Sequence, residues 1–188
     1  MNRITEILAV TAVISLIPGL TVADTHNDKK AGDAPQQQIP MHALTEEGTG
    51  EQIGTITASR TPYGVLFEPD LTGLSAGVHG FHLHQNPDCG PSEKDGKVTP
   101  GGAAGGHFNP NNGNHNGPYE KGHLGDLPAL YATEEGKVTV PVLAPRLEFG
   151  DLDGHALVIH KGGDNYSDEP QALGGGGARV ACGVIATE

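Results

Sequence analysis

The segment that decides the fold reads His79-Gly80-Phe81-His82-Leu83-His84. Residues two apart in a β-strand point to the same face, so His82 and His84 project together, while Phe81 and Leu83 project to the other side. One face is then apolar and suited to a core, and the other carries two imidazoles. The pattern predicts a strand in the wall of a β-barrel or sandwich, with the beginning of a metal site on its polar face.

The composition of the chain supports an all-β fold. Among 188 residues there are 29 glycines and 14 prolines, which indicate many turns and long loops, and only 4% of residues are aromatic. Short β-type segments are separated by Gly, Pro or Asp turns, and eight antiparallel strands are predicted at 41–44, 53–59, 65–71, 78–85, 127–132, 137–142, 156–160 and 179–186. Two long loops, 86–125 and 161–178, separate some of these strands, and loops of such length are usually functional or disordered.

The N-terminus is expected to lie outside the folded domain. Residues 1–23 have the pattern of a signal peptide, with Arg3, an apolar run over 7–20 and small residues before Asp24; an uncleaved membrane anchor is the alternative. Residues 24–38 are polar and are predicted to form a flexible leader. The domain would occupy 39–188, outside the cytoplasm and with no membrane contact after signal removal.

The net charge of −12 argues against some partners. Nucleic acids and anionic membrane surfaces attract basic proteins, so neither is expected to bind here.

A second group of candidate ligands follows the first in one loop. This group consists of His107, His115, His123 and Asp126. Three imidazoles and a carboxylate suit tetrahedral zinc. Together with His82 and His84 they supply ligands for more than one ion, and the sequence predicts a two-metal site.

These motifs resemble one protein family, the copper-zinc superoxide dismutases of the bacterial periplasmic type. The matching segments are 80–84 (GFHLH), 106–110 (GHFNP), 122–128 (GHLGDLP), 156–160 (ALVIH) and 173–185 (LGGGGARVACGVI). They cover nearly the whole mature chain in the family's order. The resemblance implies an eight-stranded Greek-key β-barrel or sandwich, periplasmic localisation and a possible homodimer.

The resemblance also implies roles for particular residues. One copper per chain would be bound by His82, His84, His107 and His160. One zinc per chain would be bound by His107, His115, His123 and Asp126. His107 would be shared as an imidazolate and would also carry a proton. Arg179 would bind a small anion beside copper, and Asp164 would link a copper-binding histidine to a zinc-binding one.

The reaction implied is the disproportionation of superoxide to dioxygen and hydrogen peroxide. Because the surface is acidic, attraction of the anion would need a local positive patch, for which Lys94, Lys97 and Lys161 are candidates.

The two cysteines, Cys89 and Cys182, are an even number in a chain with an export signal, which favours a disulfide over two free thiols. This bond would tie the loop near Cys89 to the last strand, next to Arg179.

Three alternative functions differ in the residues that they require. A metal carrier would need the ligands but neither Arg179 nor Asp164; a copper-only relative would lack the zinc ligands; a structural sandwich would need none of these residues. His79 and His155 match no metal position and are expected to form structural hydrogen bonds.

Overall fold

The computed structural model describes residues 34–187. The predicted signal peptide and most of the predicted leader therefore lie outside the described residues.

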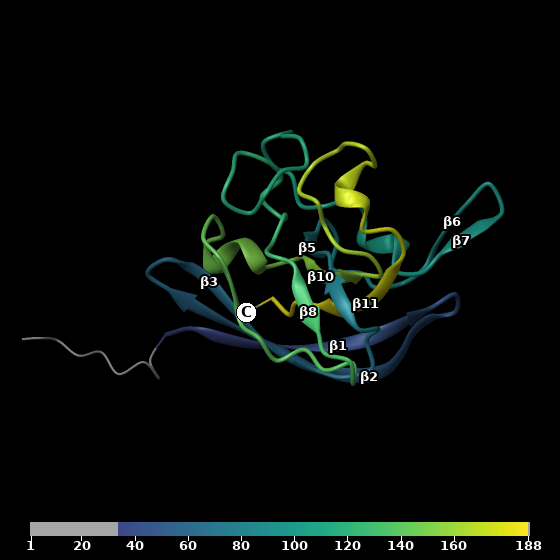
Figure 1. Cartoon of the computed structure of the whole chain (residues 1–188), viewed down its shortest axis with the longest axis horizontal. Coiled ribbons are helices and arrows are strands. Elements are labelled where there is room, and N and C mark those ends of the chain that lie inside the picture. The colour runs from purple at the N-terminus through teal and green to yellow at the C-terminus, as the bar shows by residue number, and fades with distance from the viewer. Residues whose placement is uncertain (1–33, 188) are drawn as a thin grey trace, which may run out of the picture. The chain divides into compact units, whose positions relative to one another are not determined.

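The scaffold is a curled sheet of seven strands in which every neighbouring pair is antiparallel (Figure 1). In spatial order the strands are β5 (Phe81–His84), β10 (Ala156–His160), β11 (Arg179–Val184), β1 (Gln36–Thr45), β2 (Gly48–Thr61), β3 (Gly64–Leu71) and β9 (Val142–Ala144). The chain crosses from one side of this sheet to the other between β3 and β5, and again between β9 and β10. Segments distant in sequence are thereby made neighbours.

Shorter elements complete the fold. One strand pair joins β4 (Gly77–His79) to β8 (Leu130–Ala132), and a hairpin joins β6 (Ser92–Lys94) to β7 (Lys97–Thr99). Three single turns of 3-10 helix are η1 (Gly102–Ala104), η2 (Phe149–Leu152) and η3 (Leu173–Gly175). No helix within residues 34–187 is long and apolar enough to cross a bilayer.

The all-β prediction is confirmed, but the described chain has eleven strand segments where eight were predicted. The predicted strand 78–85 is broken at Gly80, because its N–H donates to Gly162 O and its carbonyl accepts from His160, each at 2.8 Å. Most of the predicted strand 137–142 forms only a bridge from Val138 to Leu71, and β9 begins at Val142. The β6–β7 hairpin lies in what was predicted to be loop.

The ordered domain begins before Ile39, the expected start. Strand β1 starts at Gln36, where Gln36 pairs with Ser59 and Gln38 with Thr57. The glutamines have no apolar period of their own; they are ordered because β2 is long enough to offer them backbone partners.

The core is aliphatic and is supplied by alternate residues of the strands. In β3, Val65, Phe67 and Leu71 are fully buried, as period-two alternation requires. Phe67 meets Phe81 of β5 edge to face with the ring centroids 5.4 Å apart. The alternation predicted for β5 is confirmed, since Phe81 and Leu83 belong to this core.

Two hairpin turns connect the first three strands. In each, a threonine hydroxyl donates to the carbonyl of the glycine three residues later: Thr45 to Gly48, and Thr61 to Gly64. At Gly64, where φ is +119°, an added Cβ would lie 2.3 Å from Ala144 O, so only glycine fits.

The long loops gather on one side of the sheet (Figure 1). The first long loop runs over 85–129 between β5 and β8 and includes the β6–β7 hairpin; the second long loop runs over 161–178 between β10 and β11. Their ends lie next to β5 and β10, the strands that carry the predicted ligands His82, His84 and His160.

Candidate metal centre

The first long loop lies along β5 as if it were a further strand. Isolated antiparallel bridges place His84 opposite His107 and His82 opposite Asp126. Between them, Phe108 N donates to Leu83 O at 2.7 Å and Leu83 N donates to Gly125 O at 3.0 Å. The backbone register therefore places the candidate ligands of the loop, His107 and Asp126, opposite those of the strand.

Strand β10 brings a further histidine from the other side of β5. Its Val158 pairs with His82, and an irregularity between Ile159 and His160 places His160 opposite Arg179 of β11. All the predicted ligands are buried: His82, His84, His107, His115, His123, Asp126 and His160.

The first cluster consists of His82, His84, His107 and His160, whose ligand atoms lie within 4.8 Å of one another. His84 Nδ1 lies 2.9 Å from Gly105 O and His160 Nδ1 lies 3.2 Å from Gly177 O. A carbonyl only accepts, so both Nδ1 atoms carry the proton, and the two Nε2 atoms face each other with lone pairs at 3.4 Å.

Two more nitrogens of this cluster lack partners. His82 Nδ1 and His107 Nε2 are buried and find no hydrogen-bond partner among the described residues. Buried polar atoms normally have a hydrogen-bond partner. These two nitrogens, together with the two Nε2 atoms that face each other without a proton, fit a bound cation. The donor set, all imidazole, suits copper.

The second cluster surrounds one oxygen, Asp126 Oδ1. It lies 2.9 Å from Nδ1 of His107, 2.9 Å from Nδ1 of His115 and 3.2 Å from Nδ1 of His123. A tetrahedral ion with ligands at about 2.0–2.1 Å separates its ligand atoms by about 3.3 Å. The set therefore fits zinc. His123 is less closely grouped than the others, because the ligand atoms that all lie within 4.8 Å of one another here belong to His82, His107, His115 and Asp126.

His107 belongs to both clusters. Its Nδ1 faces Asp126 in the second cluster, while its unpartnered Nε2 faces the first. One imidazole therefore spans the two places where an ion fits.

Asp164, from the second long loop, joins the clusters a second time. Its Oδ2 lies 2.8 Å from His82 Nε2 and its Oδ1 lies 2.8 Å from His115 Nε2. Tyr166 N also donates to Oδ1, at 2.7 Å. Gly174, where φ is +70°, leaves room for this contact, since an added Cβ there would lie 1.9 Å from Asp164 Oδ1. The predicted link is present in the geometry.

Burial and hydrogen bonding give the two clusters different protonation states. Burial lowers the pKa of His82 to about 3 and that of His160 to about 4. Burial raises the pKa of Asp126, but hydrogen bonds from His107 and His115 outweigh it and the pKa falls below its ordinary value. Burial also acts to lower the pKa of His115, yet its bonds to Asp126 and Asp164 raise it to about 9. Neutral imidazoles thus fill the first cluster, and an anion centres the second.

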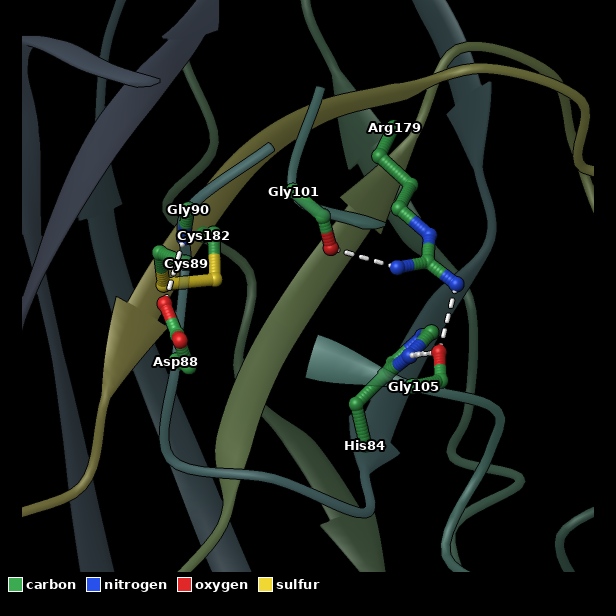
Figure 2. The surroundings of a disulfide bond; sticks show 8 residues. All are labelled: His84, Asp88, Cys89, Gly90, Gly101, Gly105, Arg179 and Cys182. Carbon is green, nitrogen blue, oxygen red and sulfur yellow. Dashed lines mark hydrogen bonds between the residues drawn. A yellow bond between two sulfur atoms is a disulfide. The ribbon is translucent and has the colours of Figure 1, made fainter. Parts of the chain in front are cut away.

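Arg179 is held beside the first cluster by two backbone carbonyls (Figure 2). Its Nη1 donates to Gly101 O and its Nη2 to Gly105 O. Gly105 O also accepts from His84 Nδ1, so one carbonyl positions both side chains.

The predicted disulfide between Cys89 and Cys182 is confirmed, with the Cα atoms 5.8 Å apart. It ties the segment that carries Gly101 and Gly105 to β11 (Figure 2).

Other residues support the site through backbone contacts. As expected for a structural residue, His79 hydrogen-bonds His160 O and Ser75 O, each at 2.7 Å. Two residues were missed by sequence reasoning: Asp168, whose Oδ2 accepts from His115 N at 3.1 Å, and Arg146, which donates to the first long loop. Neither belongs to a ligand motif, so no sequence signal identified them.

The fold and the paired clusters define a class, that of β-barrel proteins in which one histidine belongs to two groups of candidate metal ligands. The chain belongs to the copper/zinc superoxide dismutase (SODC) family, whose model matches residues 52–185. It is 58% identical over 144 residues to "Superoxide dismutase [Cu-Zn]" of Photobacterium leiognathi, covering 76% of this chain and 83% of that one. A relative from Salmonella typhimurium strain LT2 is 59% identical over 150 residues, covering 78% of this chain and 85% of that one.

Solved structures agree with this assignment. The Cu/Zn superoxide dismutase from Brucella abortus matches with a TM-score of 0.79 and 48% identity, covering 80% of this chain and 99% of that one. A monomeric copper, zinc superoxide dismutase from Salmonella enterica matches with a TM-score of 0.73 and 48% identity, also covering 80% of this chain and 99% of that one.

Proposed function

We propose that this protein disproportionates superoxide to dioxygen and hydrogen peroxide at a copper ion joined by an imidazole to a structural zinc ion. The observation that carries the proposal is the position of His107, whose Nδ1 faces Asp126 while its Nε2 stands buried and unpartnered among the described residues. Membership of the copper/zinc superoxide dismutase family supports the same reaction.

The two clusters would hold different ions. The residues proposed for copper are His82, His84, His107 and His160. The residues proposed for zinc are His107, His115, His123 and Asp126. Copper supplies one-electron redox chemistry when bound, whereas zinc has none and would order the first long loop. The balanced reaction consumes two superoxide ions and two protons.

Arg179 is proposed to bind the substrate. A guanidinium has five N–H donors, and at least one on each of two nitrogens is used on Gly101 O and Gly105 O. The remaining donors can hydrogen-bond a small anion while the carbonyls keep the fork in place.

His107 is proposed to carry a proton. Its Nε2 is the atom that faces the first cluster, and Nδ1 is engaged with Asp126. Nε2 can therefore hold a proton and deliver it to the reduced oxygen species next to Arg179.

The test of this function is superoxide dismutation by the purified mature chain, with copper and zinc counted in the same sample. About one of each per chain with fast turnover supports the proposal, and His160→Ala should lose copper and activity together. Full occupancy of both metals without turnover would refute it and favour the metal carrier instead.

Replacement of Arg179 should lower the rate without removing the metals. In Arg179→Gln the charged donors are lost, and charge-assisted hydrogen bonds are worth about 1.5–3 kcal/mol, so the rate should fall about 10- to 100-fold. Metal content and rate are measured together, with the exposed Arg60→Gln as the matched control. An unchanged rate in Arg179→Gln would exclude this role.

We also propose that residues 1–23 direct export to the periplasm and that the leader ends where β1 begins at Gln36. N-terminal sequencing of the protein from a periplasmic fraction tests this, with cleavage after Ala23 expected. The homodimer stays a prediction, to be tested by light scattering of the purified protein; the Salmonella enterica relative is described as monomeric.

A further inference from the structure

Arg146 grips the first long loop from outside it. The residue lies between β9 and η2 and is half-buried. Its Nε donates to Pro118 O at 3.0 Å, its Nη1 to Gly122 O at 3.3 Å, and its Nη2 to His123 O. All three acceptors lie between the candidate ligands His115 and Asp126, so one side chain fixes the backbone of that stretch.

The grip ends where two candidate ligands are joined. His123 O accepts from Arg146 and also from the backbone N–H of Asp126, at 3.3 Å. If the His123 carbonyl moved, the side chains of His123 and Asp126 would move with it.

The stretch also has backbone contacts of its own, since His123 N donates to Asn114 O at 3.1 Å and Gly125 N donates to Phe108 O at 2.8 Å. It contains Pro118 and three glycines, at 117, 122 and 125, which supply no side chains for packing. The charge of Arg146 is also attracted to Asp126, which opposes the lowering of the arginine's pKa by burial. Arg146 therefore adds, from outside the stretch, one side chain that fixes three of its backbone carbonyls.

We propose that Arg146 is a positioning residue for zinc: by holding the carbonyls of Pro118, Gly122 and His123 it places the His123 and Asp126 side chains where zinc requires them. This inference rests on the proposed function only in assigning zinc to the second cluster. Arg146 touches the ligands only through the His123 backbone, and its effect is on affinity for the ion.

The test compares zinc affinity with copper affinity in the full mature chain. Zinc binding to copper-free protein is measured by competition with a chelator, and the absorption of bound Co²⁺ reports the ligand geometry. Loss of a residue that orients metal ligands typically costs 10- to 100-fold in affinity, and that loss is expected for zinc in Arg146→Gln, with copper affinity unchanged within about twofold. Arg146→Lys keeps the positive charge but not the guanidinium group, so its zinc affinity should lie between those of the unaltered chain and Arg146→Gln.

The matched control is Arg60→Gln, because Arg60 lines the same surface hollow as Arg146 but is exposed. Unchanged zinc affinity in both Arg146 variants, or an equal loss of zinc and copper, would overturn the inference. If the unaltered chain bound copper and turned over superoxide but bound no zinc at the second cluster, the inference would fail while the dismutase activity stood. If the unaltered chain bound zinc at the second cluster but did not turn over superoxide, the proposed function alone would fail.

Discussion

Each candidate copper ligand uses its two ring nitrogens for different purposes. In His84 and His160 one nitrogen donates to a backbone carbonyl, and in His82 one nitrogen bonds Asp164. The hydrogen bond fixes which nitrogen carries the proton and how the ring is turned, so the other nitrogen is aimed at the site in advance.

The stability of the metal-free protein should depend on pH in two directions. The folded pKa values of His82 and His160, about 3 and about 4, lie below the ordinary 6.5. The unfolded chain then binds more protons below 6.5, so the free energy of unfolding should fall as pH drops from 6.5 towards 4. His115 has the opposite sign: its pKa of about 9 adds stability that is complete below 6.5 and lost as pH rises through 9.

Chemical denaturation of metal-free protein at pH 5, 7 and 9 measures this dependence, and a maximum near neutral pH is expected. His115→Gln should remove the loss between pH 7 and 9 and keep the loss on the acid side. A flat profile from 5 to 9 would contradict both assignments.

Asp164→Asn should weaken both metals while leaving the shape of the side chain intact. An amide has one acceptor oxygen where the carboxylate has two, so His82 or His115 would lose its acceptor and face a donor. We expect both affinities to fall about 10- to 100-fold, measured by chelator competition. The control is Asp70→Asn, an exposed carboxylate on β3. Unchanged affinities would mean that packing alone turns the rings, such as the stacking of His82 on His107 at 3.8 Å.

At the scale of elements, the disulfide joins a loop to a strand across a sequence separation of 93 residues. Closure of a loop of that size is worth about 4–5 kcal/mol of unfolding free energy in chain-entropy estimates. Metal-free Cys89→Ala/Cys182→Ala should lose about that much in urea denaturation. Added reductant should destabilise the unaltered chain and leave the double variant unchanged. A loss below about 1 kcal/mol would contradict the chain-entropy estimate for this bond.

The strands could be predicted where apolar and polar residues alternate strongly. The prediction failed where a segment forms a strand only because another strand offers it backbone hydrogen bonds. The segments 53–59, 65–71 and 156–160 lie within β2, β3 and β10 because their apolar period faces one core. Gln36 and the β6–β7 hairpin have no such period, and their pairing is set by backbone partners that the sequence does not reveal.

Candidate ligands were predictable because metal chemistry demands particular side chains at particular spacings. The structure brings every one of them together, and their metal roles stay predictions. The support around them was only partly predictable. Asp164 came from a motif, whereas Arg146 and Asp168 act on backbone atoms, a role that any polar residue within reach can fill.

For the whole molecule, zinc would hold together the part of the first long loop between His107 and Asp126, two residues 19 positions apart. A ligand bound only by the folded state adds about 4 kcal/mol when present at 1,000 times its dissociation constant. Removal of zinc by a chelator should therefore lower the thermal midpoint, and His123→Ala should reduce the zinc-dependent part of that shift. The midpoint is read by circular dichroism. Equal midpoints with and without zinc would contradict the second cluster as its site.

The two threonine–glycine turns have a consequence for the order in which the molecule assembles. They join β1, β2 and β3 through contacts between near neighbours in sequence, and the entropy lost in closing so short a loop is small. The candidate copper ligands come instead from segments about 80 residues apart, such as β5 and β10, and contacts of that kind form slowly. We therefore expect the hairpins to form early and serve as a template, and the copper site to be completed late in folding.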